Sequence, residues 1–197
     1  MSRLFESIRV VDGAALHLDY HNARLNRSRR ELFGCTDVIE LRDVMHIPYD
    51  LGNGVYKCRV VYAEEIEQVE FVSYQRRDIK SLTLVKCDSV EYAHKFVDRA
   101  CIESLVHKVT TDDILIVKHG CVTDASFANV VFYDGTRWVT PSTPLLPGTA
   151  RARLLESGTI VADEIRKADL RHFKKAALIN AMISLEDTIP LGMDDIF

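Results

Sequence analysis

In the first third of the chain, the pattern of hydrophobic and polar positions changes from the period of a strand to that of a helix and back. Residues 4–11 alternate imperfectly and predict a strand, and residues 14–18 predict its partner in a hairpin. The apolar spacing then becomes helical, which predicts a helix over residues 20–33. Asp19 is its expected N-terminal cap and Gly34 its expected stop.

The following segment completes a small domain. Residues 37–45 predict a second helix, because their apolar side chains fall on one face. Residues 55–63 and 69–74 return to a strand pattern and predict an antiparallel pair. Together these elements predict a small α+β domain over residues 1–77.

The rest of the chain, residues 78–197, has a pattern of its own. A helix is expected to start near Asp88, because apolar residues from Tyr92 to Cys101 recur at helical spacing. Strands and helices then interleave, which predicts a larger mixed α/β domain and an α+β protein of two domains. The expected strands cover residues 114–118, 129–133, 138–139, 159–162 and 176–179, and the expected helices begin at residue 148 or 149 and near residue 167.

Composition limits the classes of function. The chain has 197 residues, 47% of them hydrophobic, which allows one substantial core or two small ones. A net charge of −4 gives no general attraction to nucleic acid or to anionic membranes, and no apolar stretch reaches 18 residues. Five scattered cysteines without a C-x-x-C spacing argue against a zinc site and a disulfide framework, and for a reducing compartment. We expect no metal site. We expect a cytoplasmic protein.

Two segments carry candidate chemistry. Residues 120–129 place Asp124 in a bend of small residues directly before an apolar strand, where a planar ligand could approach the backbone. Residues 146–151 open a helix with Pro147-Gly148, and the amide groups of a helix N-terminus favour an anion such as phosphate. Taken alone, each also fits a blander interpretation: a turn aspartate and an ordinary Pro-Gly helix start.

Taken in order, four motifs resemble the class IV aminotransferase family, the fold type IV enzymes that use pyridoxal phosphate. The motifs are His21-Asn22-Ala23-Arg24-Leu25, Asp78-Ile79-Lys80-Ser81-Leu82, Thr123-Asp124 with Asn129, and Leu146-Pro147-Gly148-Thr149-Ala150-Arg151. The resemblance extends from Phe5 to Leu191, with a shortened N-terminal domain. It implies a cofactor site between the two predicted domains.

The resemblance also implies roles for single residues. Lys80 would form the aldimine with the cofactor and move protons, and Lys86 is the weaker candidate. Asp124 would take the ring nitrogen in place of the usual glutamate, with a reach shorter by roughly 1.5 Å. The remaining cofactor-binding residues are Asn129, which follows Asp124, and the phosphate contacts Arg24, Gly148, Thr149, Ala150, Asn180 and Ala181. Ala150 stands where the family has threonine, so one hydroxyl contact is lost, and Thr149 is its possible substitute.

Substrate contacts are expected from the strand that carries Arg59 and Tyr62. Arg59 could hold a substrate carboxylate, or it could pair with Glu67 or Glu70 on or near the neighbouring strand. Both alternatives stay open at the level of sequence.

For the activity, the resemblance favours a lyase similar to 4-amino-4-deoxychorismate lyase, which releases pyruvate and forms 4-aminobenzoate, a reaction of folate biosynthesis. The alternatives are a small branched-chain or D-amino-acid transaminase and a non-catalytic protein of the same fold. The family also implies a small-molecule amino substrate and a homodimer.

Overall fold

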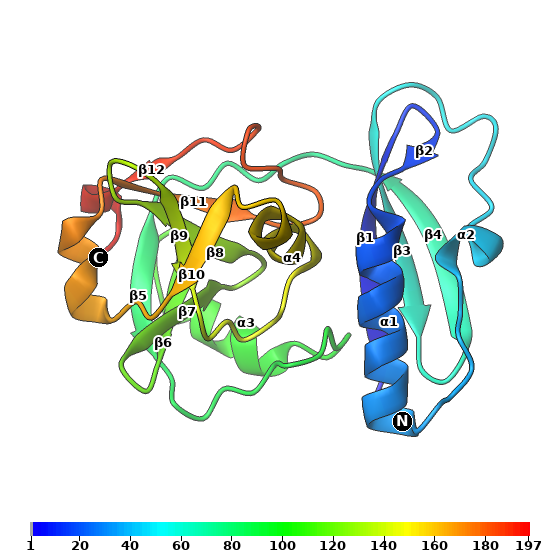
Figure 1. The fold of residues 1–197 in the computed structure, drawn as a ribbon, viewed down its shortest axis with the longest axis horizontal. Coiled ribbons are helices and arrows are strands. Elements are labelled where there is room, and N and C mark those ends of the chain that lie inside the picture. The colour runs from blue at the N-terminus through cyan, green and yellow to red at the C-terminus, as the bar shows by residue number, and fades with distance from the viewer. Residues whose placement is uncertain (1) are drawn as a thin grey trace. The chain divides into compact units, whose positions relative to one another are not determined.

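A computed structural model describes residues 2–197, and this part of the chain divides into two compact units (Figure 1). Unit 1 contains the residues up to Arg76 together with His94–Asp98, and unit 2 contains Arg77–Ala93 and Arg99–Phe197. The sequence predicts a single division after residue 77. The structure differs in returning the short segment His94–Asp98 to the first unit.

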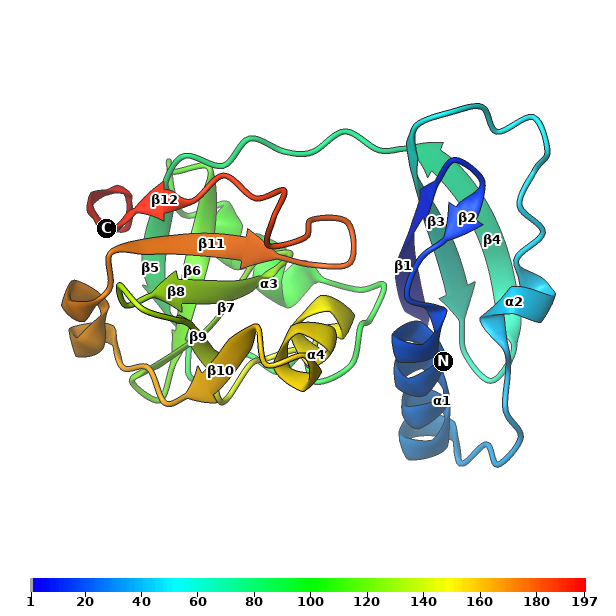
Figure 2. The same cartoon turned by 45° about the horizontal axis from the view of Figure 1, so that its top comes forward.

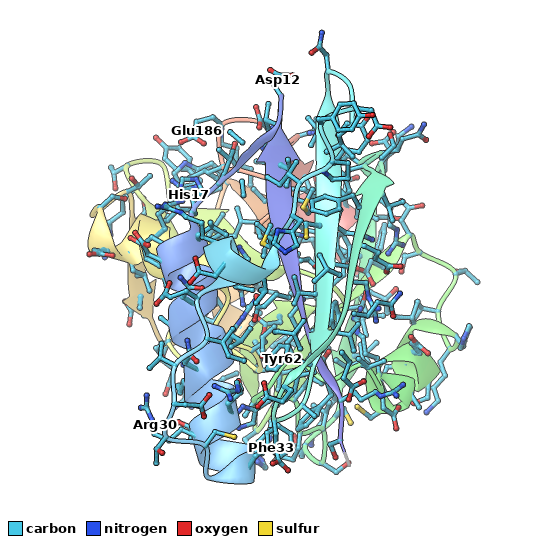
Figure 3. All side chains as sticks on the ribbon, turned by 90° about the vertical axis from the view of Figure 1, so that its right-hand side faces the viewer. Asp12, His17, Arg30, Phe33, Tyr62 and Glu186 are labelled. Atoms are coloured by element: carbon cyan, nitrogen blue, oxygen red, sulfur yellow. The ribbon has the colours of Figure 1, made fainter. Side chains whose placement is uncertain are left out.

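Unit 1 is a four-stranded antiparallel sheet, in the order β2-β1-β3-β4, with helices packed against it. Its strands are β1 (Leu4–Val11), β2 (Ala14–Ala15), β3 (Val55–Tyr62) and β4 (Ile66–Ser73). Burial alternates strictly along β1, so one face of the strand enters the core and the other does not. The turn at Asp12 lies at one end of this sheet, and Tyr62 lies at the other (Figure 3).

The helices of unit 1 are α1 (Leu18–Phe33) and α2 (Leu41–Val44). Gly34 ends α1 in the left-handed conformation at φ 73°, as expected for a glycine stop. The expected cap is wrong: His17 occupies the N-cap position and Asp19 lies inside the first turn. The second helix is also shorter than predicted, because side chains of α1 bind the backbone of residues 37–41.

Three residues of α1 account for that shortening. Asn26 donates from Nδ2 to the carbonyl of Ile39 and accepts at Oδ1 from its amide, at 2.8 and 2.9 Å. Arg29 donates to the carbonyl of Asp37 at 3.0 Å, and Asn22 accepts from the amide of Leu41 at 2.9 Å. Backbone groups satisfied in this way do not need helical partners.

Unit 2 is built on a sheet in the order β10-β9-β8-β7-β6-β5, which β11 extends by pairing with β8 and β12. Figure 2 shows β11 running beside β8. Its strands are β5 (Leu82–Lys86), β6 (Asp113–Lys118), β7 (Cys121–Ala125), β8 (Asn129–Tyr133), β9 (Trp138–Pro141), β10 (Ile160–Asp163), β11 (Lys175–Ile179) and β12 (Leu191–Gly192). The helices are α3 (Ala100–Val106), α4 (Thr149–Glu156) and the short 3-10 segments η1 (Lys167–His172) and η2 (Met193–Asp195).

The helix predicted from Asp88 is wrong, because residues 87–99 form no helix and α3 begins only at Ala100. The prediction also missed β5, which pairs in parallel with β6, and β7, which contains Asp124. The other strands predicted in this half are present within a few residues of their expected ends.

Strand register brings several chain segments to one end of the unit 2 sheet. Leu82, the first residue of β5, pairs with Asp113, the first residue of β6. Leu115 in β6 then pairs with Ala125, the last residue of β7. The chain just before β5, the end of β7 and the start of β8 are therefore neighbours at this end of the sheet.

Candidate active site

Asp124 and Asn129 face each other across the hairpin of β7 and β8. Asn129 donates from Nδ2 to Oδ1 of Asp124 at 2.7 Å, and the amide of Leu146 donates to Oδ2 at 2.9 Å. Both side chains are buried. Leu146, 22 positions further along the chain, thus fixes the Asp124 carboxylate from its second side.

Burial raises the pKa of the Asp124 carboxyl to about 6, against the opposing effect of the bonds from Leu146 and Asn129. A carboxylate offers about four acceptor positions, so these bonds leave room for a further donor. No cation among residues 2–197 forms an ion pair with this carboxylate, although the charge of Arg151 acts on it, so it is suited to a protonated ring nitrogen.

The turn before α4 is also held by Asn129. Asn129 also donates from Nδ2 to the carbonyl of Leu146 at 2.9 Å. A Cβ atom on Gly148 would lie 2.0 Å from Oδ1 of Asn129, so any other residue at this position would have to displace the Asn129 side chain. Gly148 is the N-cap of α4 and no side chain caps the helix, so its first amide groups are suited to an anion.

Thr149 and Ala150 form the first turn of α4, and both are buried. Ala150 supplies no hydroxyl, so an anion there would rely on backbone amides. Arg151, the next residue, donates from Nη2 to the carbonyl of Pro141 at 2.7 Å, while its Nε is buried without a hydrogen-bond partner among residues 2–197.

Asn180 and Ala181 follow β11 directly, and Ile179 pairs with Asn129. This register brings the second predicted phosphate segment, Asn180 and Ala181, close to Asn129, which binds the turn before α4. The Asn180 side chain accepts from the amides of Met182 and Ile183 at 2.8 and 3.0 Å, which holds the turn closed. The backbone amide of Asn180 donates to Ile183, so Ala181 is the better candidate for an amide contact.

Lys80 lies just before β5, at the end of the sheet where β7 ends. Its backbone amide donates to Oδ2 of Asp112 at 2.9 Å. Its side chain is 78% exposed, and Nζ lies 3.3 Å from Asp78. In the described part of the chain, Lys80 makes no polar contact with Asp124.

Arg24 is part of a buried network within unit 1. Glu6 on β1 accepts from Nε and Nη2 of Arg24 at 2.9 and 2.6 Å, and it lies 2.6 Å from Nδ1 of His21. Burial alone would raise the pKa of Glu6, but the charge of Arg24 and the bonds from both partners lower it to about 2. Two donors of Arg24 are therefore committed to Glu6, and its contact with a phosphate stays a prediction.

The two predicted substrate residues have other contacts in unit 1. Arg59 lies 3.6 Å from Glu70 and places its guanidinium 5.0 Å from the ring centroid of Phe5. This arrangement favours the ion-pair alternative for Arg59. Tyr62 is fully buried in the core of unit 1, where burial raises the pKa of its hydroxyl. Its surroundings are those of a packing residue.

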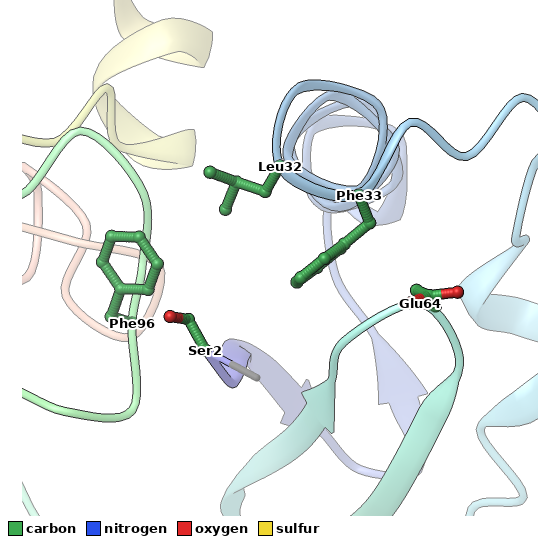
Figure 4. A pocket seen from close by; sticks show the side chains of 5 residues that line it. All are labelled: Ser2, Leu32, Phe33, Glu64 and Phe96. Atoms are coloured by element: carbon green, nitrogen blue, oxygen red, sulfur yellow. The ribbon is translucent and has the colours of Figure 1, made fainter.

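A hollow of about 470 Å³ in unit 1 is lined by Ser2, Leu32, Phe33, Glu64 and Phe96 (Figure 4). None of the predicted site residues lines it, and Glu64 is its one ionisable side chain. Residues 2–197 contain no cluster of side chains suited to a metal ion, and none of their helices is long and apolar enough to cross a membrane.

Comparison with known proteins identifies the family. Residues 63–185 match the family model described as amino-transferase class IV. An uncharacterised protein of Haemophilus influenzae is 36% identical over 188 residues, covering 94% of this chain and all of its own. A solved structure from Haemophilus somnus, named a "putative 4-amino-4-deoxychorismate lyase", has a TM-score of 0.87 and 32% identity, covering 94% of this chain and 98% of that one.

The chain belongs to the class IV aminotransferase family. It has the mixed α and β architecture of fold type IV and is a pyridoxal-phosphate-dependent enzyme. A hypothetical aminotransferase from Mycobacterium tuberculosis, solved in its cofactor-bound form, shares the fold with a TM-score of 0.78 and 19% identity, covering 96% of this chain and 80% of that one.

The residues of unit 2 fit this cofactor. Asp124 offers a buried carboxylate, α4 offers an uncapped N-terminus, and Gly148 lets the turn pack closely on Asn129. The sequence did not indicate Asp112, which binds the segment of Lys80. Its only signal was a carboxylate placed just before the predicted strand over residues 114–118.

Proposed function

We propose that the protein is a lyase that converts 4-amino-4-deoxychorismate into 4-aminobenzoate and pyruvate. The observation that carries the proposal is the buried cluster of Asp124, Asn129 and Leu146 beside the start of α4. The choice of lyase is supported by the likeness, at 32% identity over nearly the whole chain, to the Haemophilus somnus protein.

Within the proposal, each residue of unit 2 has a defined task. The amides of Thr149 and Ala150 at the start of α4 bind the cofactor phosphate, and the turn at Ala181 adds a further amide. Asp124 keeps a proton on the pyridine nitrogen, and Asn129 holds its carboxylate in place. Bound pyridoxal phosphate supplies an electron sink for the carbon that carries the substrate amino group.

Lys80 moves the proton in this proposal. Its amine removes the proton from the ring carbon that bears the amino group. The bond from the neighbouring carbon to the enolpyruvyl oxygen breaks, and the oxygen leaves with the electron pair. Enolpyruvate takes up a proton and becomes pyruvate, while the ring becomes aromatic.

Lys80→Ala tests the assignment against a matched control. Lys80 and Lys86 are both exposed, and each lies near an aspartate, at 3.3 Å from Asp78 and 3.4 Å from Asp88. We expect Lys80→Ala to abolish borohydride labelling and the formation of 4-aminobenzoate, whereas Lys86→Ala retains both. Mass spectrometry locates the label. A labelled, active Lys80→Ala variant would overturn the assignment.

A product assay tests the reaction itself. Purified enzyme with aminodeoxychorismate is expected to release 4-aminobenzoate and pyruvate in equal amounts without a keto acid. Amino transfer that depends on a keto acid, with no pyruvate released from aminodeoxychorismate, would contradict the lyase proposal.

We further propose that the enzyme is a homodimer of the cytoplasm. The absence of disulfides among the five described cysteines supports a reducing compartment. Sedimentation of the loaded enzyme is expected to give twice the chain mass of 22.4 kDa. A monomer that retains cofactor and activity would contradict the dimer.

A further inference from the structure

Arg77 lies three residues before Lys80, and no role was predicted for it. Its guanidinium carbon lies 4.9 Å from the ring centroid of Phe127, within the range of a cation–π contact. Nη2 donates to the carbonyl of Asp112 at 3.0 Å. The contact with the ring and this bond fix the guanidinium plane.

Asp112 joins Arg77 to the proposed catalytic lysine. Its carboxylate accepts from the amides of Lys80 and Ser81 at 2.9 and 3.0 Å, and from the Ser81 hydroxyl at 3.0 Å. Its carbonyl accepts from Arg77. One residue thus holds both the segment of Lys80 and the Arg77 guanidinium.

Phe127 joins Arg77 to the cofactor residues. It lies in the turn between Asp124 and Asn129, which pair across β7 and β8. Its carbonyl lies 3.4 Å from Nδ2 of Asn180, in the second predicted phosphate segment. The ring beneath Arg77 therefore belongs to the turn that connects the proposed cofactor contacts.

The charge of Arg77 is available to a ligand. The side chain is exposed, and within residues 2–197 no carboxylate oxygen lies within ion-pair distance of it. Burial raises the pKa of the Asp113 carboxyl, and the charge of Arg77 is among the influences that oppose this rise. Arg24 and Arg59 differ, since Glu6 and Glu70 are their carboxylate partners.

We propose that Arg77 binds a carboxylate of the substrate and selects ring-shaped acids. With Nη2 bonded to Asp112, the guanidinium keeps Nε and Nη1 as donors, and its fork suits a carboxylate. The Phe127 ring beside it offers an apolar surface for the substrate ring. This inference rests on the proposed function, because it takes Lys80 and Asp124 as the reacting centre.

The test compares two ligands of nearly the same shape, 4-aminobenzoate and the uncharged 4-aminobenzamide. Calorimetric titration of the loaded enzyme measures their dissociation constants for wild type, Arg77→Gln, Arg77→Lys and the control Arg137→Gln. Arg137 is an exposed arginine at the turn between β8 and β9, 3.4 Å from Asp134.

We expect Arg77→Gln to weaken the binding of 4-aminobenzoate by about tenfold or more, the effect of one charge-assisted hydrogen bond. Arg77→Lys is expected to restore part of the affinity, because lysine keeps the charge without the fork. The amide ligand and the Arg137→Gln control are expected to change less than about twofold, within the range usual for surface substitutions.

Three results would overturn the inference: no binding of 4-aminobenzoate by wild type, unchanged affinity in Arg77→Gln, or equal weakening of both ligands. The visible absorbance band and borohydride labelling of Lys80 are measured on the same samples. If the wild type lacks these signals, the proposed function is wrong. If the wild type shows them but Arg77→Gln binds 4-aminobenzoate as tightly as the wild type does, only the Arg77 assignment is wrong.

Discussion

At the scale of single residues, Asp124 shows how the site conflicts with stability. Its carboxyl is buried between Asn129 and the Leu146 amide, and burial raises its pKa from 3.8 to about 6. The folded protein therefore holds this proton more tightly than the unfolded chain does. The ionised form of this buried carboxyl therefore destabilises the cofactor-free protein above pH 6.

Asp124→Asn is expected to remove this pH dependence. Because the folded pKa lies above the unfolded one, the free energy of unfolding of the cofactor-free wild type falls as pH rises from about 4 to about 6, by about 3 kcal/mol from this residue. Urea unfolding followed by the fluorescence of Trp138, the single tryptophan, measures it.

Other titrating groups are common to the wild type and Asp124→Asn, so the difference between the two curves isolates Asp124. Curves that run parallel from pH 4 to pH 8 would contradict the expected raised pKa. In the loaded enzyme, the same variant is expected to lose activity by about a hundredfold, because in the proposed site the ring nitrogen would lose its acid partner.

At the scale of elements, the start of α4 depends on a contact with the β7–β8 hairpin. Gly148 has φ −70° and ψ 147°, which any residue adopts, so its backbone conformation does not require glycine. The requirement comes from Asn129, whose Oδ1 occupies the place of a Cβ atom. The start of α4 therefore packs against the β7–β8 hairpin through the contact of Gly148 with the Asn129 side chain.

Gly148→Ala is expected to displace the Asn129 side chain from Asp124 and Leu146, and to weaken cofactor binding about tenfold or more. The double variant with Asn129→Ala tests the cause, because it removes the obstructing atoms. We expect a coupling of at least about 1 kcal/mol between the two substitutions, measured as cofactor dissociation constants. Strictly additive effects would exclude the clash as the cause.

The same scale shows where sequence patterns mislead. Tyr92 and Phe96 are four residues apart and predict one helix face, but Tyr92 is buried in unit 2 and Phe96 packs against the core of unit 1. The backbone on either side of Phe96 pairs with the chain at the start of β1: the amide of Phe5 donates to the carbonyl of Lys95, and the amide of Val97 donates to the carbonyl of Arg3. Tertiary hydrogen bonds replaced the helix.

At the scale of the whole molecule, unit 1 is completed by residues that follow the first strand of unit 2. Leu4 pairs with Phe96 in an antiparallel bridge, and His94 lies 3.1 Å from the Ser28 hydroxyl. The chain thus leaves unit 1 at Arg76, builds β5, and returns for His94–Asp98. The stability of unit 1 therefore depends on residues 94–98, which the sequence pattern places in the second domain.

Phe96→Ala is expected to destabilise unit 1 by about 2 kcal/mol, less than truncation of a fully buried phenylalanine costs, because this side chain is only partly buried. Trp138 lies in unit 2, so its fluorescence reports that unit, whereas far-ultraviolet circular dichroism reports both. In urea, the dichroism transition is expected to gain an earlier component while the fluorescence midpoint stays fixed.

Phe197→Ala is the matched control, because this exposed phenylalanine pairs with Leu82 and Leu84 through its backbone alone. It is expected to leave the dichroism transition of unit 1 unchanged. An equal shift of both probes in Phe96→Ala would show that the segment stabilises the two units together.

The sequence by itself determined the elements whose hydrogen bonds are local or whose alternation is regular, such as β1, α1 with its Gly34 stop, β8 and α4. The resemblance of its motifs to those of the family also pointed to Asp124, Asn129 and Gly148. Only the tertiary structure decided that Leu146 holds Asp124, that Asp112 holds both Lys80 and Arg77, and that Glu6 holds Arg24. These contacts join residues 18 to 35 positions apart, so strand register and packing set them, and local periodicity carries no information about either.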